Sequence, residues 1–385
     1  MFLERQTTEQ KEYYGRMLSA VGALSRLFSE SNEPYIAYRV AENLFCKAFD
    51  ARNLSRGDTS ADASKAMLGF GIKTFLHKNG RSFEKVAEFN KDHHLFSSLS
   101  PEEKILKVAG LRNERIETTK RIAGVNDIIY HCVTRRESEI YVYEEPMRVV
   151  QLDTIKNLKL NKGVIHFEDA FEEYKFVISK STLYKRFIAD NILLDIPVSI
   201  IDDPFEVVEG LISTGSARQV VPESKKEERV FLPLYSERGE KHVPESSGLN
   251  QWNAKGRPRH PNEVYIPIPI WIHRAFPNFF PPRDISFNLH IPSGEVLNAK
   301  VCQDNSKALM TNPNQKLGEW LLRDILNLKE GELLTYKKLE RIGLDSVVVY
   351  KTSDGEYGID FTKEGAYEEF LNEKKIGKTE GYAEE

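Results

Sequence analysis

Asp62 and Lys73 are the residues of this sequence whose types and spacing best suit hydrolysis of a phosphodiester. Asp62 lies in the polar segment 60–64. Lys73 lies eleven residues later in 69–75, where apolar and polar residues alternate as in a strand. A carboxylate is the kind of hard oxygen ligand that Mg²⁺ prefers, and an ammonium group can stabilise charge on phosphoryl oxygens. The spacing therefore predicts a metal-dependent carboxylate site.

This arrangement resembles the PD-(D/E)XK nuclease core, in which a β-hairpin presents an aspartate, a second acid and a lysine on one side of a sheet. The resemblance implies that Asp62 binds Mg²⁺ and that Lys73 orients the attacking water. The sequence departs from the pattern at Gly71, where an acid is expected. Because some members carry this acid on an adjacent helix, Glu88 is our candidate for it. Glu42, on an earlier helix, is our candidate for the acid that completes the metal site.

The same residues have structural interpretations that spacing does not exclude. Asp62 suits a turn, Lys73 suits an exposed strand position, and Glu88 suits the solvated face of a helix. Asp58 is an alternative to Asp62. Gly57 beside Asp58 favours a turn, however, whereas alanines flank Asp62 as strand neighbours would.

Other chemistries have weaker support. No GxxxxGK[ST] loop is present, so we expect no use of ATP, and no glycine-rich methyl-donor loop precedes an Asn-Pro-Pro-Tyr type motif. The run 92–94, Asp-His-His, could belong to a histidine–metal nuclease, although adjacent histidines are common by chance. The basic segment 174–186 could contact the DNA backbone near the cut, or could be an edge strand kept soluble by its lysines.

The composition is that of an ordinary globular protein. The 385 residues favour two domains, and the 54 Lys and Arg against 58 Asp and Glu give a net charge of −4, so DNA binding must rest on local clusters. Mean hydropathy is −0.46, and no apolar run is long enough to span a membrane. The first residues lack the pattern of a signal peptide, and the three cysteines are far apart, so we expect a cytoplasmic protein.

Residues 1–222 are expected to form one unit of mixed helices and strands. Helical spacing covers four segments, the last with Ser82 as its cap: 7–31, 34–49, 101–123 and 82–89. Strand patterns cover 69–75, 126–132, 139–143, 164–167 and 175–179, and 181–187 suits either a strand or a short helix. A helix at 202–212 is followed by a polar linker at 213–228.

Residues 223–365 are expected to form a β barrel or sandwich, followed by an acidic tail at 366–385. Eight prolines between 258 and 292 separate short apolar runs. Strands are expected at 231–235, 264–268, 287–291, 299–302, 347–350 and 357–361, with one helix at 317–326.

The second unit contains two polar segments suited to reading DNA. Residues 251–260 combine amide side chains, a tryptophan and three cations, and residues 302–316 repeat this polar character between a strand and a helix. Amides can pair with adenine edges, arginines pair with guanine, and both Lys and Arg neutralise phosphate. Two such arms could hold one groove between them. A solvated loop with one anchoring tryptophan is the alternative.

The second unit resembles the C-terminal domain of NgoFVII-type restriction endonucleases over about 130 residues. The runs that carry the resemblance are 246–254, 261–269, 279–284, 299–304, 307–310, 318–323, 331–335 and 344–348. The resemblance implies a β pseudobarrel like the plant B-three domain, with two arms that wrap the major groove.

The resemblance assigns twelve candidate DNA-binding residues to these arms. The first arm would carry Arg238, Gln251, Trp252, Asn253, Arg257 and Arg259. The second would carry Gln303, Asn305, Lys307, Thr311, Asn312 and Asn314. Which of them contact bases and which contact phosphates is left open.

Several residues of this unit are expected to be structural. Trp252 is expected to fix the first arm to the barrel rather than to stack on a base, while Trp271 and Trp320 are expected in the core. Asp284 and Asp304 would repel phosphate, so each is expected to orient a neighbouring Arg or Lys.

The familiar partner of this DNA reader is a phospholipase-D-like nuclease with an HxK motif, and no histidine here has Lys two positions later. We therefore expect an α+β multidomain protein with an N-terminal α/β restriction-endonuclease-like core and a C-terminal β pseudobarrel. The expected function is that of a Mg²⁺-dependent type II restriction endonuclease acting on double-stranded DNA. Cleavage of both strands with one site per chain would suit a homodimer. A non-catalytic DNA-binding protein and a nuclease for modified DNA are the alternatives.

Overall fold

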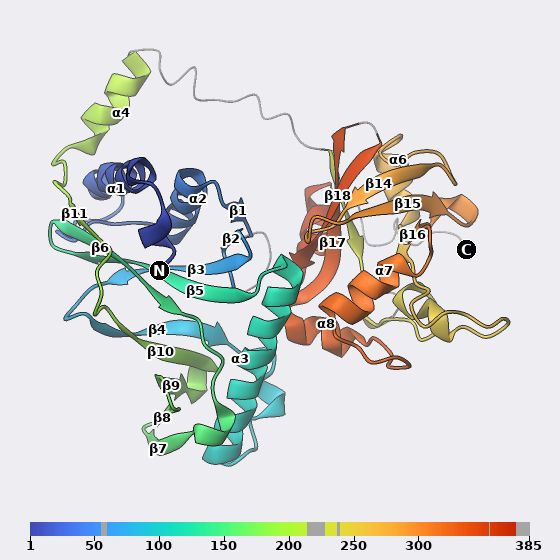
Figure 1. The fold of residues 1–385 in the computed structure, drawn as a ribbon, viewed down its shortest axis with the longest axis horizontal. Helices are drawn as coiled ribbons and strands as arrows, with labels where there is room; N and C mark the ends of the chain where they lie inside the picture. The colour runs from blue at the N-terminus through green and yellow to red at the C-terminus, as the bar shows by residue number, and fades with distance from the viewer. Residues whose placement is uncertain (55–59, 214–227, 237–238, 354, 375–385) are drawn as a thin grey trace. The chain divides into compact units, whose positions relative to one another are not determined.

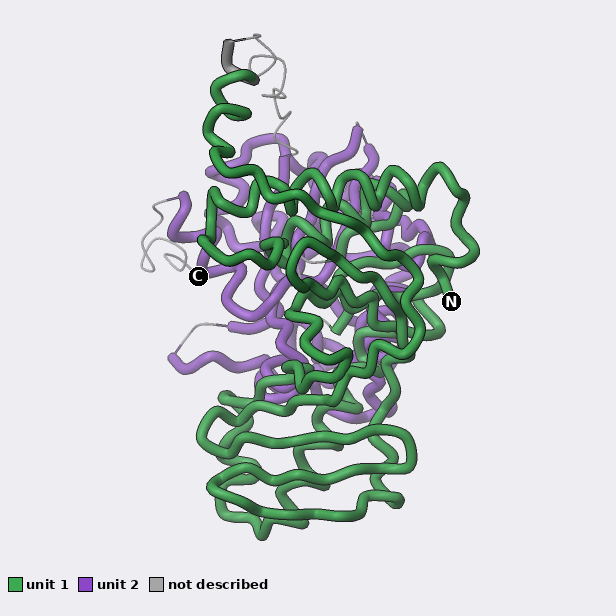
Figure 2. The backbone as a smooth tube through the Cα atoms, turned by 90° about the vertical axis from the view of Figure 1, so that its left-hand side faces the viewer, with its two compact units in different colours: residues 1–55, 59–120, 125–223 green, residues 56–58, 121–124, 224–385 purple. Residues whose placement is uncertain are grey.

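The computed structural model describes residues 1–54, 60–213, 228–236, 239–353 and 355–374. The chain divides into two compact units between residues 223 and 224, with the short segments 56–58 and 121–124 grouped with the second unit (Figure 2). Most of the expected linker, residues 214–227, lies outside the described residues. Within the described part of the chain, no helix has both the length and the apolar character needed to cross a bilayer.

A six-stranded sheet forms the centre of the first unit (Figure 1). Its order is β1-β2-β3-β5-β6-β11, and β3 and β5 are parallel while their other neighbours are antiparallel. The strands are β1 (Arg52–Asn53), β2 (Ala63–Lys65), β3 (Leu68–Leu76), β5 (Asp127–Arg136), β6 (Glu139–Pro146) and β11 (Leu194–Pro197). Parallel strands require a long crossover, which the segment between β3 and β5 supplies.

Helices α1 (Thr8–Ala23) and α2 (Tyr38–Phe49) pack on this sheet. A capping box between Thr7 and Gln10 begins α1, since the two side chains satisfy exposed backbone amides reciprocally. Helix α2 places buried residues three and four positions apart, which gives it one apolar face. That face packs against Phe70 and Ile72 of β3. Short 3-10 turns η1 (Leu3–Arg5) and η2 (Ser25–Leu27) flank α1.

A second, antiparallel sheet has the order β4-β10-β9-β8-β7. Its strands are β4 (Arg81–Glu88), β7 (Lys156–Asn161), β8 (Val164–Glu168), β9 (Glu173–Val177) and β10 (Thr182–Ile188). Apolar residues of α3 (Pro101–Ala123) share a core with the inward side chains of β8, β9 and β10. Turns η3 (His93–Leu95), η4 (Leu152–Thr154) and η5 (Ile178–Lys180) and helix α4 (Pro204–Ser213) complete the unit.

The second unit is a seven-stranded, nearly closed barrel-like sheet. Its order is β12-β17-β18-β14-β15-β16-β13, and its two outermost strands contact each other. The strands are β12 (Arg229–Pro233), β13 (Ile266–Pro267), β14 (Ser286–His290), β15 (Val296–Cys302), β16 (Ala308–Thr311), β17 (Leu344–Ser353) and β18 (Glu356–Lys363). Trp271 and Trp320 lie in its core, as expected.

The helical segments of this unit pack against the barrel or connect its strands. They are η6 (Gly248–Asn253), α6 (Ile270–Ala275), η7 (Asp304–Ser306), α7 (Lys316–Gly318), the π-helical η8 (Glu319–Ile325), α8 (Tyr336–Ile342) and α9 (Ala366–Glu373). The expectation of a tail from residue 366 is wrong for α9, because Tyr367, Phe370 and Leu371 are buried in the barrel core. Residues 375–385 lie outside the described residues.

One expected helix of the first unit is a strand. Residues 82–89 showed helical spacing, but 81–88 form β4 and pair along their length with β10. Eight residues are too few for the helical and strand periods to be separated with certainty. The turn through Gly80, where φ is +72°, returns the chain into a second sheet. The expected helix at 101–123 is confirmed as α3.

Candidate functional site

Asp62 stands at the point where β2 begins beside β3. Its backbone amide donates to the carbonyl of Phe70 (2.7 Å), and its carboxylate Oδ2 accepts from the amide of Ile72 (2.7 Å). The side chain is therefore held against β3 by the strand that also carries Lys73. This contact fixes the carboxylate at the edge of the sheet instead of leaving it in solvent.

Burial raises the pKa of Asp62 to about 6. The Ile72 amide opposes this rise by stabilising the carboxylate, Glu42 adds to it through repulsion, and Lys73 and Arg39 oppose it through attraction. These four side-chain and backbone groups come from α2 and β3, so the fold brings Asp62, Glu42 and Lys73 into one electrostatic cluster. Perturbed carboxylates of this kind are common at functional sites.

Glu42 lies on α2 and is almost fully buried, with 4% of its surface exposed. Arg39, one helical turn earlier, donates to Glu42 Oε2 at 2.9 Å. The half-buried thiol of Cys46, a further turn along α2, has a raised pKa because of burial and because Glu42 and Asp62 repel its thiolate. Sequence reasoning missed Arg39, although its position three residues before Glu42 is a recognisable helical pairing.

Lys73 lies on the face of β3 opposite to α2. Phe70 and Ile72 pack in the core with α2, and side chains alternate along a strand, so the Lys73 side chain points to the other face. In the part of the chain that the structure describes, Lys73 forms no ion pair, while it interacts electrostatically with Asp62 and with Cys132 on β5.

Gly71, where the nuclease pattern has an acid, has little room for a side chain. A Cβ added there would lie 2.6 Å from Met147 Cε, 3.2 Å from the carbonyl oxygen of Ser60 and 3.3 Å from the ring of Tyr130. The Ser60 contact involves backbone, which moves less easily than the end of the methionine. The departure from the pattern is thus accompanied by close packing at this position.

Glu88 is not part of this cluster. It ends β4 in the other sheet, where its exposed carboxylate pairs with Lys85 at 3.1 Å. No interaction described for Asp62 involves Glu88. Glu42 and Lys73 therefore each interact with Asp62, from opposite faces of β3, whereas Glu88 lies apart from all three.

The remaining alternatives for the first unit have structural partners or are not described. His93 contacts the Ser181 hydroxyl at 3.1 Å, and Asp92 pairs with Arg115 at 2.8 Å, so the segment 92–94 is used locally. Asp58 lies outside the described residues.

The donor set is compatible with Mg²⁺ but does not form a complete protein cage. Among the described residues, no group of three or more His, Cys, Asp or Glu side chains is arranged to hold a metal. Mg²⁺ keeps several waters and commonly uses only one or two carboxylates together with substrate phosphates. Asp62 and Glu42 would supply the one or two carboxylates that such a Mg²⁺ site uses.

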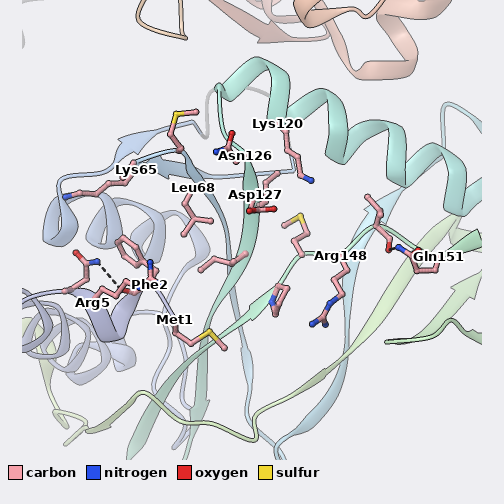
Figure 3. A pocket seen from close by; sticks show the side chains of 18 residues that line it. Met1, Phe2, Arg5, Lys65, Leu68, Lys120, Asn126, Asp127, Arg148 and Gln151 are labelled. Atoms are coloured by element: carbon pink, nitrogen blue, oxygen red, sulfur yellow. Dashed lines mark hydrogen bonds between the residues drawn. The ribbon is translucent and has the colours of Figure 1, made fainter.

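A separate basic pocket of about 830 Å³ opens where β3 and β5 begin and β6 ends (Figure 3). Its lining contains one acid, Asp127, and four cations, Arg5, Lys65, Lys120 and Arg148. Three of the cations have partners: Lys65 donates to the Phe49 carbonyl, Lys120 lies 3.0 Å from Glu117, and Arg148 lies 3.2 Å from Glu172. The lining does not include Asp62, Glu42 or Lys73.

In the second unit, the first arm is anchored by buried contacts. The fully buried Asn250 donates to the carbonyls of Pro244 and Leu334 and accepts from the Leu334 amide at 2.9 Å. Trp252 packs against the barrel core, as expected for an anchoring residue. Gln251 is half-buried, and the exposed Asn253 donates to the Glu245 carbonyl at 3.0 Å.

Arg257 and Arg259 both pair with Glu263, which is buried. Arg257 makes a two-pronged contact with the carboxylate, one prong at 3.1 Å, and remains half-exposed. Arg259 is more buried and also donates to the Ala254 carbonyl at 2.6 Å, so it shapes the loop. Arg238 lies outside the described residues.

The candidates on the second arm lie at opposite ends of β16. Gln303, Asn305 and Lys307 belong to the hairpin that precedes β16, whereas Asn312 and Asn314 follow it. Thr311 is buried: its hydroxyl accepts from the Leu317 amide at 3.0 Å and donates to the Pro313 carbonyl at 2.9 Å.

The first arm approaches the end of β16 where Asn312 lies. Arg323 of η8 donates to the Asn262 side chain at 2.7 Å and to the Pro261 carbonyl at 2.8 Å, which ties the base of the first arm to the helix after Asn314. At the other end, His273 contacts the Ser306 carbonyl at 3.0 Å. Polar loops therefore flank both ends of the β13–β16 pair.

The expectation for the two aspartates of this region is confirmed. Asp284 lies 3.1 Å from Lys300 and 3.3 Å from Arg283, and Asp304 lies 3.4 Å from Arg283. The hydrogen bond from Lys300 lowers the pKa of Asp284. Arg283 and Lys300 were not among the twelve candidates, although both lay within the basic block of the sequence.

Comparison with known families identifies the second unit. Residues 224–353 match the NgoFVII C-terminal B3-like DNA-binding domain. The matched region, here called the NgoFVII-type domain, covers strands β12 to β17 with their flanking polar loops and ends before β18, and it supports DNA as a partner of the chain. The first unit lies outside the match. A comparison with curated proteins gave no match.

Proposed function

We propose that the chain is a site-specific deoxyribonuclease of the restriction type. In this proposal the first unit hydrolyses phosphodiester bonds of duplex DNA, and the NgoFVII-type domain selects the sequence. The observation that carries it is the electrostatic cluster of Asp62, Glu42 and Lys73 in a unit joined to a DNA-binding domain of restriction endonucleases. A domain that binds a particular DNA sequence would direct cleavage by the first unit to that sequence.

The proposed roles follow from the chemistry of each group. Asp62 and Glu42 would hold Mg²⁺, which when bound polarises the scissile phosphate and favours ionisation of water. The Ile72 amide holds the Asp62 carboxylate in place. Lys73, which has no ion pair among the described residues, would orient the water or stabilise charge on the phosphoryl oxygens.

The proposed recognition mode uses loops at both ends of the β13–β16 pair. The four residues of β16 span about 10 Å at a rise of about 3.3 Å per residue, which is comparable to the roughly 12 Å width of the major groove. Asn312 and the first arm would contact one side of the groove, and Gln303 and Asn305 the other. Because each chain has one candidate catalytic cluster, cutting both strands suggests a homodimer or two successive nicks.

A second candidate is a DNA-binding protein without catalysis. Gly71 in place of an acid and the ion pair between Glu42 and Arg39 favour it, because both reduce the number of carboxylates available to a metal. The first unit would then serve another role beside the DNA-binding domain.

Incubation with plasmid DNA and Mg²⁺, followed by sequencing of the ends, tests the proposal. Discrete fragments with a common end sequence, lost in Lys73→Ala, support a site-specific nuclease. If unmodified and methylated plasmids both stay intact while a duplex selected from a random library still binds, the second candidate replaces the first. Cutting of methylated plasmid alone would assign the protein to modified DNA.

A further inference from the structure

The outer face of the five-stranded sheet in the first unit carries a row of cationic and aromatic residues. The row follows from strand register: Lys85 on β4 pairs with Tyr184 on β10, Tyr184 with Lys175 on β9, Lys175 with His166 on β8, and His166 with Lys159 on β7. The five residues therefore cross the whole sheet, one from each strand.

This row faces away from the core shared with α3. The neighbouring residues Tyr174, Phe176 and Leu183 are buried in that core, and side chains alternate along a strand. Lys85, His166 and Lys159 are exposed, and Lys175 and Tyr184 are half-buried. Lysines on edge strands prevent unwanted pairing, but Lys175 lies on an interior strand, so edge protection does not explain it.

Aromatic rings hold the central cations of this face in position. Lys175 Nζ lies 4.9 Å from the ring centre of Phe83 and 5.0 Å from that of Tyr184. Arg186 Cζ lies 4.2 Å from the ring centre of Phe83. Such contacts order the long side chains while leaving their charge able to attract an anion. The rings themselves are covered by cations and are not free to stack on bases.

The acids on this face are fewer than the cations and are already paired. Glu173 lies 2.8 Å from Arg186, Glu168 lies 3.6 Å from Lys156, and Glu88 lies 3.1 Å from Lys85. Within the described residues, Lys159 and Lys175 have no carboxylate partner. The surface is thus positive along its centre, although the whole chain has a net charge of −4.

We propose that this row, the sheet stripe, binds the phosphate backbone of duplex DNA without reading its sequence. Five strands spaced by about 4.8 Å give a stripe of roughly 19 Å, a length of duplex that carries on the order of 11 phosphate charges. The sheet stripe provides a second DNA contact, outside the NgoFVII-type domain. The proposal rests on DNA binding by this chain and is independent of whether the first unit cuts.

Salt dependence of binding tests the proposal in the full-length protein. The probe is a fluorescein-labelled duplex of mixed sequence, and its dissociation constant is measured over a series of NaCl concentrations without Mg²⁺. The double variant Lys159→Gln/Lys175→Gln removes two charges and keeps a polar side chain that is only one atom shorter at each position. The logarithm of the association constant falls linearly as the logarithm of the NaCl concentration rises. Each lost phosphate contact should make this slope shallower by about 0.9, so the slope of the double variant should be shallower by about 1.8 than that of the wild type.

The matched control is Lys11→Gln/Lys180→Gln, which removes two charges of the same unit from outside the stripe and should leave the slope unchanged. An equal fall in slope in both double variants would show a net-charge effect and overturn the proposal. An unchanged slope in the stripe variant would also overturn it and would leave an acidic protein surface as the fitting partner. Plasmid cleavage measured in parallel separates the two proposals, since loss of slope does not require cutting.

Discussion

The carboxylate of Asp62 accepts a hydrogen bond of 2.7 Å from the backbone amide of Ile72, the residue directly before Lys73. One short stretch of β3 therefore positions both groups that the sequence had suggested for phosphodiester chemistry. Because backbone donors move little, this contact fixes where the carboxylate lies before any ligand arrives. The Asp62 carboxylate is also largely buried, and burial of its charged form lowers the stability of the folded protein.

Replacement of Asp62 by asparagine should abolish cleavage without weakening the fold. Burial raises the pKa of Asp62 above its unfolded value, so the stability that its protonated form contributes at low pH is lost as pH rises through about 6. Asparagine stays neutral and can still accept from Ile72. Above pH 7, Asp62→Asn should therefore match or exceed wild-type stability, by on the order of 1–3 kcal/mol. Urea unfolding beside plasmid cleavage checks both parts. A variant that cuts normally would remove Asp62 from the catalytic cluster.

Glu42 and Glu88 should differ in their effect on cleavage. Glu42 interacts with Asp62, whereas Glu88 lies in the other sheet and pairs with Lys85. Glu42→Gln should lower the cleavage rate at least about tenfold, since each 1.4 kcal/mol of lost stabilisation is worth that factor. Glu88→Gln, which also removes one carboxylate charge, should cut at the wild-type rate. The reverse order would mean that the metal site lies elsewhere.

Gly71→Ala should destabilise the first unit through crowding. The new Cβ would meet Met147 Cε at 2.6 Å and the Ser60 carbonyl at 3.2 Å. Overpacking of this kind costs about 1–3 kcal/mol. Shortening of Met147 to alanine should recover part of that loss, so the double variant should be more stable than the two single losses predict when added. Strict additivity, measured by urea unfolding, would contradict the contact.

A pH-dependent loss of stability should arise from Glu145. Burial raises its pKa to about 7, with Glu172 adding to the rise and Lys185, at 2.5 Å, opposing it. Since the folded pKa exceeds the unfolded one, the stability due to its protonated form is lost as pH rises toward about 7. Glu145→Gln leaves Lys185 paired with Glu172 at 2.8 Å. The variant should gain about 1–3 kcal/mol relative to wild type between pH 5 and pH 8. A difference that stays constant over this range would rule out Glu145 as the source.

Substitutions of Thr311 and Asn312 should affect different properties: the first should lower protein stability, and the second should lower DNA affinity. Thr311→Val removes the acceptor of the buried Leu317 amide and should lower stability by about 1–3 kcal/mol, with DNA affinity retained below the melting temperature. Asn312 is exposed, so Asn312→Ala should keep the melting temperature. It should weaken binding of a library-selected duplex by about 1–3 kcal/mol if it pairs with a base. Equal affinity of Asn312→Ala and wild type would place recognition on other residues.

Local patterns of the sequence predicted many of the helices and strands. Helix α3 was expected at its observed bounds because charged residues are interleaved with the other residues of 101–123 over about six turns. The short segment 82–89 was misassigned, because pairing with β10, about a hundred residues later, decided its structure. Similarly, the sequence predicts a charged tail at residues 366–373, whereas one side of α9 is buried in the barrel core.

The sequence by itself determined which residue types were available: Asp62 beside a strand with Lys73, and a polar, proline-rich unit of the NgoFVII type. Only the tertiary structure decided which acid accompanies them. Glu42 reaches the cluster because α2 packs its apolar face on β3, and Glu88 does not because β4 leaves for the second sheet. The physical reason is that strand pairing and helix packing join residues far apart in the chain. The local periodicity of the sequence does not indicate which distant residues make these contacts.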